Sequence, residues 1–148
     1  KDKLPEQHQL TFGHTFAGRL RLRVTVFYQQ GLPEIVIRFV PPAIKSLREL
    51  GLPAAFENFA KAERGLLLIT GPFASGRTTT MAAILQTINH NSAKHIVTVE
   101  EPIEYVLTGE QSVVDQREVG VDVSSWDEAI HALPAEDADV VAFSKLAN

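Results

Sequence analysis

Alternating apolar and polar positions in the first forty residues predict β-strands. In residues 19–26 every second side chain is apolar, and between them stand three arginines and a threonine. A period of two is typical of a strand with one half-buried face, here with a basic outer face. A break at Gln29–Pro33 and a renewed apolar run at Ile35–Val40 predict a hairpin with a loop, and Gln9–Phe12 is a candidate third strand. Residues 1–40 are therefore predicted to form a small, largely β module.

After Pro41 and Pro42 the pattern changes. Two adjacent prolines cannot continue a sheet ladder, so they are predicted to open a linker, residues 41–64. Within it, Ser46 and Glu49 have the spacing of a capping box at a short turn of helix closed by Gly51, and a second helix is expected at 54–63. Strands at 66–70, 95–100, 113–116 and 140–143 then alternate with helices at 77–90 and 125–131. This alternation predicts an α/β fold with a parallel sheet covered on both faces.

Residues 66–80 have the layout of an apolar strand, a glycine-rich loop and a helix. They read LLLITGPFASGRTTT. The phosphate-binding pattern G-x-x-x-x-G-K-[ST] is met at Gly71, Gly76 and Thr78, but Arg77 stands in the place of its lysine. Glycines let backbone N–H groups curl around an anion, and the helix dipole points at the same place. Arginine keeps the charge but is planar and longer, so the chain is predicted to hold nucleotide without necessarily turning it over.

Composition limits the classes of function. The 148 residues are 45% hydrophobic and carry a net charge of −4, which gives no support to a nucleic-acid surface. There is no cysteine, which excludes disulfides and thiolate metal sites. No run of about eighteen apolar residues is present, and the start KDKLPEQ does not resemble a signal peptide, so the chain is expected to be cytoplasmic.

The motifs and their order resemble those of the ring-forming secretion ATPases, most closely the retraction ATPases of type IV pili that drive twitching motility. The matching segments are GRLRLRVTVF, SLRELGLP, GLLLITGPFASGRTTT, HIVTVEEPIEYV, QREVGVD and EDADVV. The fourth is the most specific, because a strand ending in two acids, a proline and another acid is typical of that family's acidic box. The resemblance implies that residues 1–40 are part of a PAS-like domain and residues 65–148 the first half of a RecA-like P-loop core.

The same resemblance implies site residues. The phosphate loop would comprise Gly71, Ala74, Ser75, Gly76, Arg77, Thr78 and Thr79. Glu100, Glu101 and Glu104 would form the acidic box near Mg²⁺ and the attacking water, with Thr78 and Glu101 serving the metal. Arg21 and Arg23 stand where the family places nucleotide-sensing residues. A plainer alternative is that the glutamates are an acidic strand end and the arginines a solvated face.

Two departures from the family pattern concern catalysis. Arg77 replaces the loop lysine, and Lys145 stands where the family has a catalytic glutamate after the last strand. An ammonium can neither deprotonate water nor complement a metal. Pro134 and Ala135 also fall where the family has leucine and arginine. Since single charge-stabilising groups are worth on the order of 10² to 10³ in rate, hydrolysis is expected to be weak or absent, and binding of ATP, ADP and Mg²⁺ weakened.

Three functions follow as hypotheses: a working motor subunit, a degenerate paralogue that binds nucleotide weakly and modulates an active pilus ATPase, and an interaction module without nucleotide. The resemblance implies a homo- or hetero-hexameric ring, contact with the inner-membrane platform protein of the pilus, and a peripheral location at that membrane. The second hypothesis is preferred on mechanistic grounds, because the loop glycines are kept while the catalytic groups are replaced.

Overall fold

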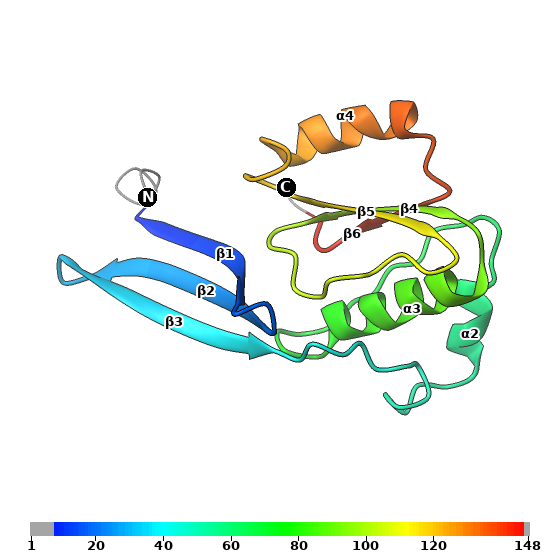
Figure 1. Ribbon diagram of the computed structural model, residues 1–148, viewed down its shortest axis with the longest axis horizontal. Helices are drawn as coiled ribbons and strands as arrows, with labels where there is room; N and C mark the ends of the chain where they lie inside the picture. The colour runs from blue at the N-terminus through cyan, green and yellow to red at the C-terminus, as the bar shows by residue number, and fades with distance from the viewer. Residues whose placement is uncertain (1–7, 147–148) are drawn as a thin grey trace.

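The chain forms two separate sheets with helices around the second one. The computed structural model describes residues 8–146. An antiparallel sheet contains β1 (Gln9–Phe16), β2 (Leu20–Gln29) and β3 (Leu32–Val40), and a parallel sheet of order β5-β4-β6 contains β4 (His95–Glu100), β5 (Val113–Glu118) and β6 (Val140–Phe143). The helices are α2 (Ala55–Ala60), α3 (Arg77–Asn91) and α4 (Trp126–Glu136). Helices α3 and α4 lie on opposite faces of the parallel sheet (Figure 1), as predicted for an α/β fold.

The antiparallel sheet has longer strands and a tighter turn than predicted. The β2–β3 connection is only Gln30 and Gly31, whose φ angles of 52° and 79° suit a two-residue hairpin turn. Pairing therefore resumes at Leu32, and Pro33 lies inside β3 opposite Tyr28. Proline is tolerated there because β3 is an edge strand. β1 continues to Phe16, four residues beyond the expected end, because its whole length pairs with β2.

The linker contains the predicted capping box but little helix. The Ser46 amide donates to a Glu49 carboxylate oxygen at 2.8 Å, and the Glu49 amide donates back to the Ser46 hydroxyl at 3.2 Å. These bonds stabilise a turn at residues 47–50 that does not extend into a helix. α2 is also shorter than the predicted range 54–63, because the hydrogen bonds of its last turn shift to the i–3 pattern at Lys61 and Ala62.

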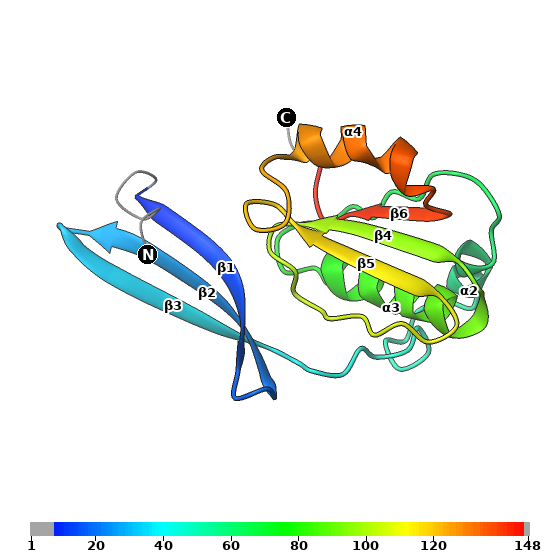
Figure 2. The ribbon, with the colours of Figure 1, turned by 45° about the horizontal axis from the view of Figure 1, so that its top comes forward.

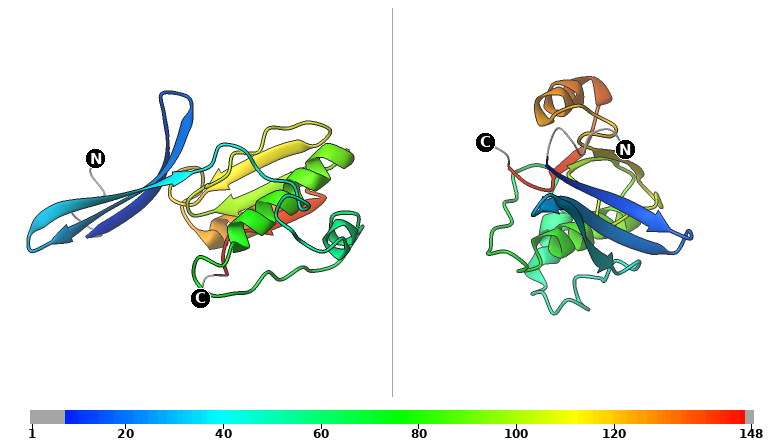
Figure 3. Two further views of the ribbon diagram at one scale, coloured as in Figure 1. Left: turned by 90° about the horizontal axis from the view of Figure 1, so that it is seen from below. Right: turned by 90° about the vertical axis from the view of Figure 1, so that its left-hand side faces the viewer.

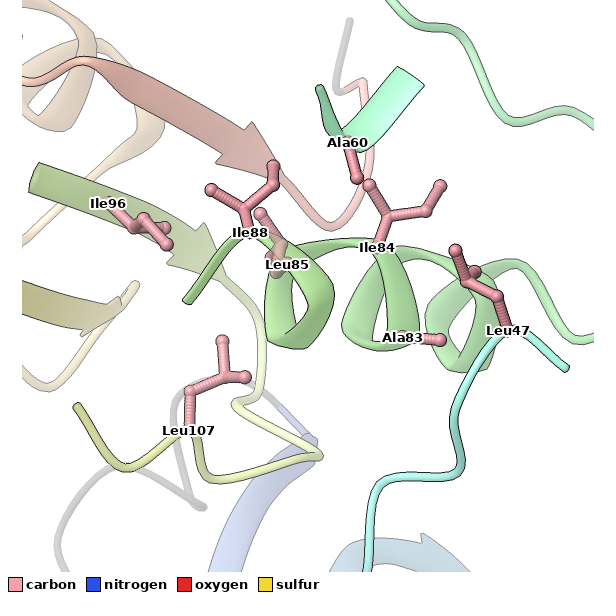
Figure 4. Close-up of a cluster of buried hydrophobic side chains, with 8 residues drawn as sticks. All are labelled: Leu47, Ala60, Ala83, Ile84, Leu85, Ile88, Ile96 and Leu107. Carbon is pink, nitrogen blue, oxygen red and sulfur yellow. The ribbon is translucent and has the colours of Figure 1, made fainter. Parts of the chain in front are cut away.

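The main core lies between α3, the linker and the parallel sheet. Figure 4 shows eight buried side chains gathered around α3: Leu47, Ala60, Ala83, Ile84, Leu85, Ile88, Ile96 and Leu107. Removing a leucine or isoleucine of this kind from water stabilises the fold by about 1.5–3 kcal/mol. The packing fixes α3 against β4. It thereby fixes where the first turn of α3 stands relative to the end of that strand.

The predicted strand at residues 66–70 is wrong. The segment follows an irregular path outside both sheets (Figure 3), and Leu66 and Leu68 are 85% and 60% exposed. Ile69 packs against the main core, but the sheet order β5-β4-β6 does not include residues 66–70. An apolar run becomes a strand only where a neighbouring strand and covering side chains receive it. Within residues 8–146, Ile69 packs against the core, but no strand pairs with this run.

Two elements extend beyond their predicted ends. β5 continues to Glu118 because it pairs with β4 along its whole length. α4 continues five residues past His131, through Pro134, to Glu136. The helix tolerates Pro134 because the missing N–H affects only its last turn. At the start of α4, the Ser125 hydroxyl caps the helix by accepting a hydrogen bond from the Glu128 amide at 3.1 Å. β4 and β6 have the bounds that the sequence predicts.

Candidate nucleotide site

The topology gathers the predicted site residues at one edge of the parallel sheet. β4, β5 and β6 run in the same direction, and their carboxyl ends face the antiparallel sheet (Figure 2). α3 runs the opposite way, so its N-terminus also lies at this edge. Ligands of α/β sheets bind outside the carboxyl ends of the strands. Arg77, Glu101, Glu118 and Lys145 therefore share the edge where a ligand is expected.

The loop before α3 keeps the backbone shape that its glycines permit. Gly76 caps α3 with a φ of 90°, a left-handed conformation that side-chain-bearing residues rarely adopt. At Gly71 an added Cβ would lie 2.5 Å from the Ser75 hydroxyl and 3.2 Å from the Ser75 Cβ, so any other residue would force Ser75 to move. No side chain caps α3, so the amides of its first turn have no capping partner from a side chain. Such a turn suits an anion.

Arg77 is exposed at the start of α3. Among residues 8–146 its guanidinium has no hydrogen-bond or ion-pair partner, so it is available to a ligand. Thr79 is different, because its hydroxyl lies 3.1 Å from the Tyr105 hydroxyl. That contact joins the first turn of α3 to residues 101–107, which follow β4 and are called the acidic segment below.

Glu100 is a buried structural carboxylate. It is 2% exposed and accepts hydrogen bonds from the Thr98 hydroxyl at 2.8 Å and from the Gln116 amide at 2.9 Å. Burial raises the pKa of Glu100, and the two hydrogen bonds offset part of that effect. A group already surrounded by protein donors is a poor choice for a metal ligand. The prediction that it acts beside Mg²⁺ has no geometric support.

Glu101 is paired with Lys145. The Lys145 ammonium lies 2.7 Å from a Glu101 carboxylate oxygen, and the Trp126 indole N–H donates to the same oxygen at 3.0 Å. Lys145 also lies 5.6 Å from the centre of the Trp126 ring, within cation–π range. Burial alone would raise the pKa of Glu101, but the hydrogen bonds from Lys145 and Trp126 and the charge of Lys145 lower it. Trp126, which belongs to none of the motifs singled out in the sequence, is thus part of the candidate site.

The arginines of β2 reach the acidic segment. Arg23 pairs with Glu104 at 2.6 Å, and Arg21 donates to the Ile103 carbonyl at 2.5 Å and lies 3.9 Å from a Glu118 carboxylate oxygen. The alternative that these arginines form a solvated face is wrong, because the side chain of Arg21 is only 16% exposed. Their role as nucleotide sensors stays a prediction.

Sequence reasoning missed Glu118. The sequence predicts a strand only at residues 113–116, whereas β5 continues to Glu118, whose side chain is buried at 7% exposure. A signal was present, because Gln116 and Glu118 are two residues apart and so lie on one face of a strand. Both side chains accept hydrogen bonds from the acidic segment. The Leu107 amide donates to the Gln116 side-chain oxygen at 2.7 Å, and the Ile103 amide donates to a Glu118 carboxylate oxygen at 3.0 Å.

The predicted magnesium ligands do not form a metal site. In residues 8–146 no group of three histidine or acidic side chains is placed to hold a metal ion. No hydrogen bond joins Thr78 to Glu101 in this part of the chain, and the carboxylate of Glu101 is already bound to an ammonium. Mg²⁺ in nucleotide sites takes one or two carboxylates together with phosphate oxygens and waters, and the carboxylate predicted for it here, Glu101, is held by Lys145. The residues present do not fit it.

Comparison with known proteins identifies the family. The profile of the type II/IV secretion system proteins matches residues 1–142. The chain belongs to this family. Among its relatives, the type IV pilus retraction ATPase PilT of Pseudomonas aeruginosa is 36% identical over 135 residues, which cover 91% of this chain and 39% of the relative. The twitching motility protein of Neisseria gonorrhoeae is 35% identical over 138 residues, covering 93% of this chain and 37% of the relative.

Structural comparison within the secretion system family agrees. A crystal structure of the pilus retraction motor PilT with bound ADP superposes with a TM-score of 0.91 at 39% identity, covering 99% of this chain and 43% of that one. The predicted fold class, a β-rich module followed by part of a P-loop core, is confirmed by this match. The chain spans about two fifths of the length of the relatives named here. None of the helices between residues 8 and 146 has the length and apolar character needed to cross a bilayer.

Proposed function

We propose that this chain is a nucleotide-binding member of the pilus retraction branch of the family, with weak or absent ATP hydrolysis. The observation that carries the proposal is the phosphate loop: Gly76 holds the left-handed cap, Gly71 allows the close approach of Ser75, and Arg77 stands free at the helix start. The relative solved with bound ADP supports the choice of ligand. Gly71, Ala74, Ser75, Gly76, Arg77, Thr78 and Thr79 remain the proposed contacts.

The replaced catalytic groups support weak hydrolysis. Lys145 occupies the position expected for a catalytic carboxylate and pairs with Glu101 at 2.7 Å. Among residues 8–146, the other acids of the predicted acidic box are also engaged, since Glu104 pairs with Arg23 and Glu100 is buried. Losing such groups costs powers of ten in rate.

The wider assignments follow the family and are part of the same proposal. They are the division into residues 1–40, 41–64 and 65–148, a homo- or hetero-hexameric ring, an inner-membrane pilus platform protein and an active paralogous ATPase as partners, and a cytoplasmic location at the inner membrane. No nucleic acid is proposed, in keeping with a net charge of −4.

A second candidate is a ring or interaction subunit that binds no nucleotide. It is favoured by the ion pairs at the sheet edge, because Glu101, Glu104 and Glu118 are balanced by basic side chains of the chain itself. Such a site needs no ligand to neutralise it.

Titration with a fluorescent ADP analogue separates the two candidates. We expect saturable binding that Arg77→Glu weakens about tenfold or more, because the substitution places a negative charge beside the phosphates; tenfold corresponds to about 1.4 kcal/mol. Arg48→Glu makes the same charge change at the exposed turn of the linker and should leave affinity unchanged. Phosphate release from ATP should match the blank. Absence of binding up to millimolar analogue would favour the second candidate.

A further inference from the structure

The acidic side chains at the carboxyl edge of the parallel sheet are each paired within the chain. Glu101 has Lys145 at 2.7 Å, Glu104 has Arg23 at 2.6 Å, and Glu118 has Arg21 at 3.9 Å. Glu100 is buried and accepts from two neutral groups instead. The positive charge that a P-loop site ordinarily takes from a divalent cation is therefore supplied here by fixed side chains.

The main chain holds Lys145 in place. Ser144 follows β6, its amide donates to the Val99 carbonyl at 3.1 Å, and its hydroxyl accepts from the Glu101 amide at 3.3 Å. The residue after it consequently stands beside Glu101, where the Trp126 ring supports its ammonium. Three separate segments of the chain build this arrangement, in which the side chains of Lys145 and Glu101 are 50% and 42% exposed.

An ammonium at this position opposes a divalent cation. Mg²⁺ brought to Glu101 would have to displace Lys145 from the carboxylate and would be repelled by it. At the other side of the site, Arg77 and the uncapped first turn of α3 attract negative charge. A polyphosphate bound to Mg²⁺ carries less net negative charge than the metal-free polyphosphate, so Arg77 and the first turn of α3 attract it less strongly.

We propose that the site takes a nucleoside di- or triphosphate as the metal-free anion, with Lys145 and Arg77 in place of Mg²⁺. The inference rests on the proposed nucleotide binding and adds the chemical form of the ligand. It also gives a reason for weak hydrolysis that lies in the missing metal as well as in the missing carboxylate.

The test compares binding of a fluorescent ADP analogue in EDTA and in magnesium chloride. We expect the dissociation constant in EDTA to be lower than that in magnesium. Lys145→Glu, which leaves two carboxylates at residues 101 and 145, should instead bind about tenfold more tightly with magnesium than without it. Lys61→Glu makes the same charge change at the end of α2, which lies beside the C-terminal end of α3 (Figure 1), and should behave as the wild type.

A second readout uses Trp126, the single tryptophan of the chain, which contacts both Glu101 and Lys145. Magnesium chloride alone should leave its emission unchanged in the wild type and change it in Lys145→Glu. If that variant fails to fold, Lys145→Gln removes the ammonium without adding an acid and should lose the preference for EDTA. Wild-type binding that requires magnesium overturns the inference but keeps the proposed function. Failure to bind in either buffer overturns both.

Discussion

Glu100 and Glu101 are adjacent in the sequence but lie in opposite surroundings. Glu100 is the last residue of β4 and points into protein, where Thr98 and Gln116 donate to it; Glu101 points to the sheet edge, where Lys145 reaches it. Burial raises the pKa of the first carboxylate, and the ion pair lowers that of the second. The end of β4 thus separates two roles: Glu100 is a buried structural acid, and Glu101, the next residue, contributes to the charge of the candidate site.

A pH dependence of stability follows from Glu100. Because its pKa is raised on folding, the folded state holds the proton more tightly than the unfolded chain. The contribution of Glu100 to the free energy of unfolding therefore falls as the pH rises from the ordinary glutamate pKa through the raised pKa. Glu100→Gln should remove this part of the slope. The check is the midpoint of urea unfolding at a series of pH values.

The control for this measurement is Glu57→Gln, on the exposed surface of α2. It should leave the slope as in the wild type. Identical slopes for Glu100→Gln and the wild type would mean that Glu100 ionises in the folded protein as it does in water, contrary to its 2% exposure.

At the scale of elements, the first turn of α3 is tied to the acidic segment by the Thr79–Tyr105 contact of 3.1 Å. Tyr105→Phe removes this hydrogen bond and leaves the ring in place. We expect a loss of about 0.5–1.5 kcal/mol in stability and a weaker affinity for the ADP analogue, because the turn that carries Arg77 and Thr78 loses its support. Chemical unfolding and the same titration measure the two effects.

Tyr28 provides the matched control, as the chain contains two tyrosines. Tyr28 is 41% exposed in β2, away from α3, so Tyr28→Phe should change neither quantity. Equal effects of the two substitutions would show that the Tyr105 hydroxyl does not support the loop.

The predictability of the elements depended on how local their stabilising interactions are. β6 and β4 could be predicted to the residue because their apolar runs are bounded by charged or polar positions, and α3 because Gly76 marks its start. The run at residues 66–70 has the same apolar signal. It does not become a strand because the partner it requires is not decided by its own side chains.

The candidate site was predictable in part for a related reason. Gly71, Gly76 and Arg77 form one local motif, so sequence spacing suffices to place them. The pairing of Lys145 with Glu101 joins residues 44 positions apart, and the position of Trp126 beside them depends on how α4 crosses the sheet. Pairings of that kind arise only from tertiary structure, which is why Glu118 and Trp126 were missed.

At the scale of the whole molecule, Arg21 and Arg23 connect the antiparallel sheet to the acidic segment of the second sheet. Figure 2 shows the antiparallel sheet on the side of the carboxyl edge of the parallel one. The contacts are the pairs Arg23–Glu104 and Arg21–Glu118 and the hydrogen bond from Arg21 to the Ile103 carbonyl. A ligand that engaged these acids or arginines would therefore change how firmly the sheets are joined.

A double-mutant cycle on Arg23 and Glu104 tests whether this junction contributes to stability. The two side chains are 35% and 15% exposed, so solvent screens the pair partly and we expect a coupling of about 0.5–1 kcal/mol.

Arg23→Gln alone should cost more stability than this coupling energy, because it leaves the largely buried Glu104 without its partner. It should also speed proteolytic cleavage in the linker at residues 41–64, since that segment follows directly after β3. Arg19→Gln, at the exposed β1–β2 turn, serves as the control and should change neither the unfolding free energy nor the cleavage rate. A coupling indistinguishable from zero, together with unchanged cleavage, would mean that the Arg23–Glu104 pair does not hold the sheets together.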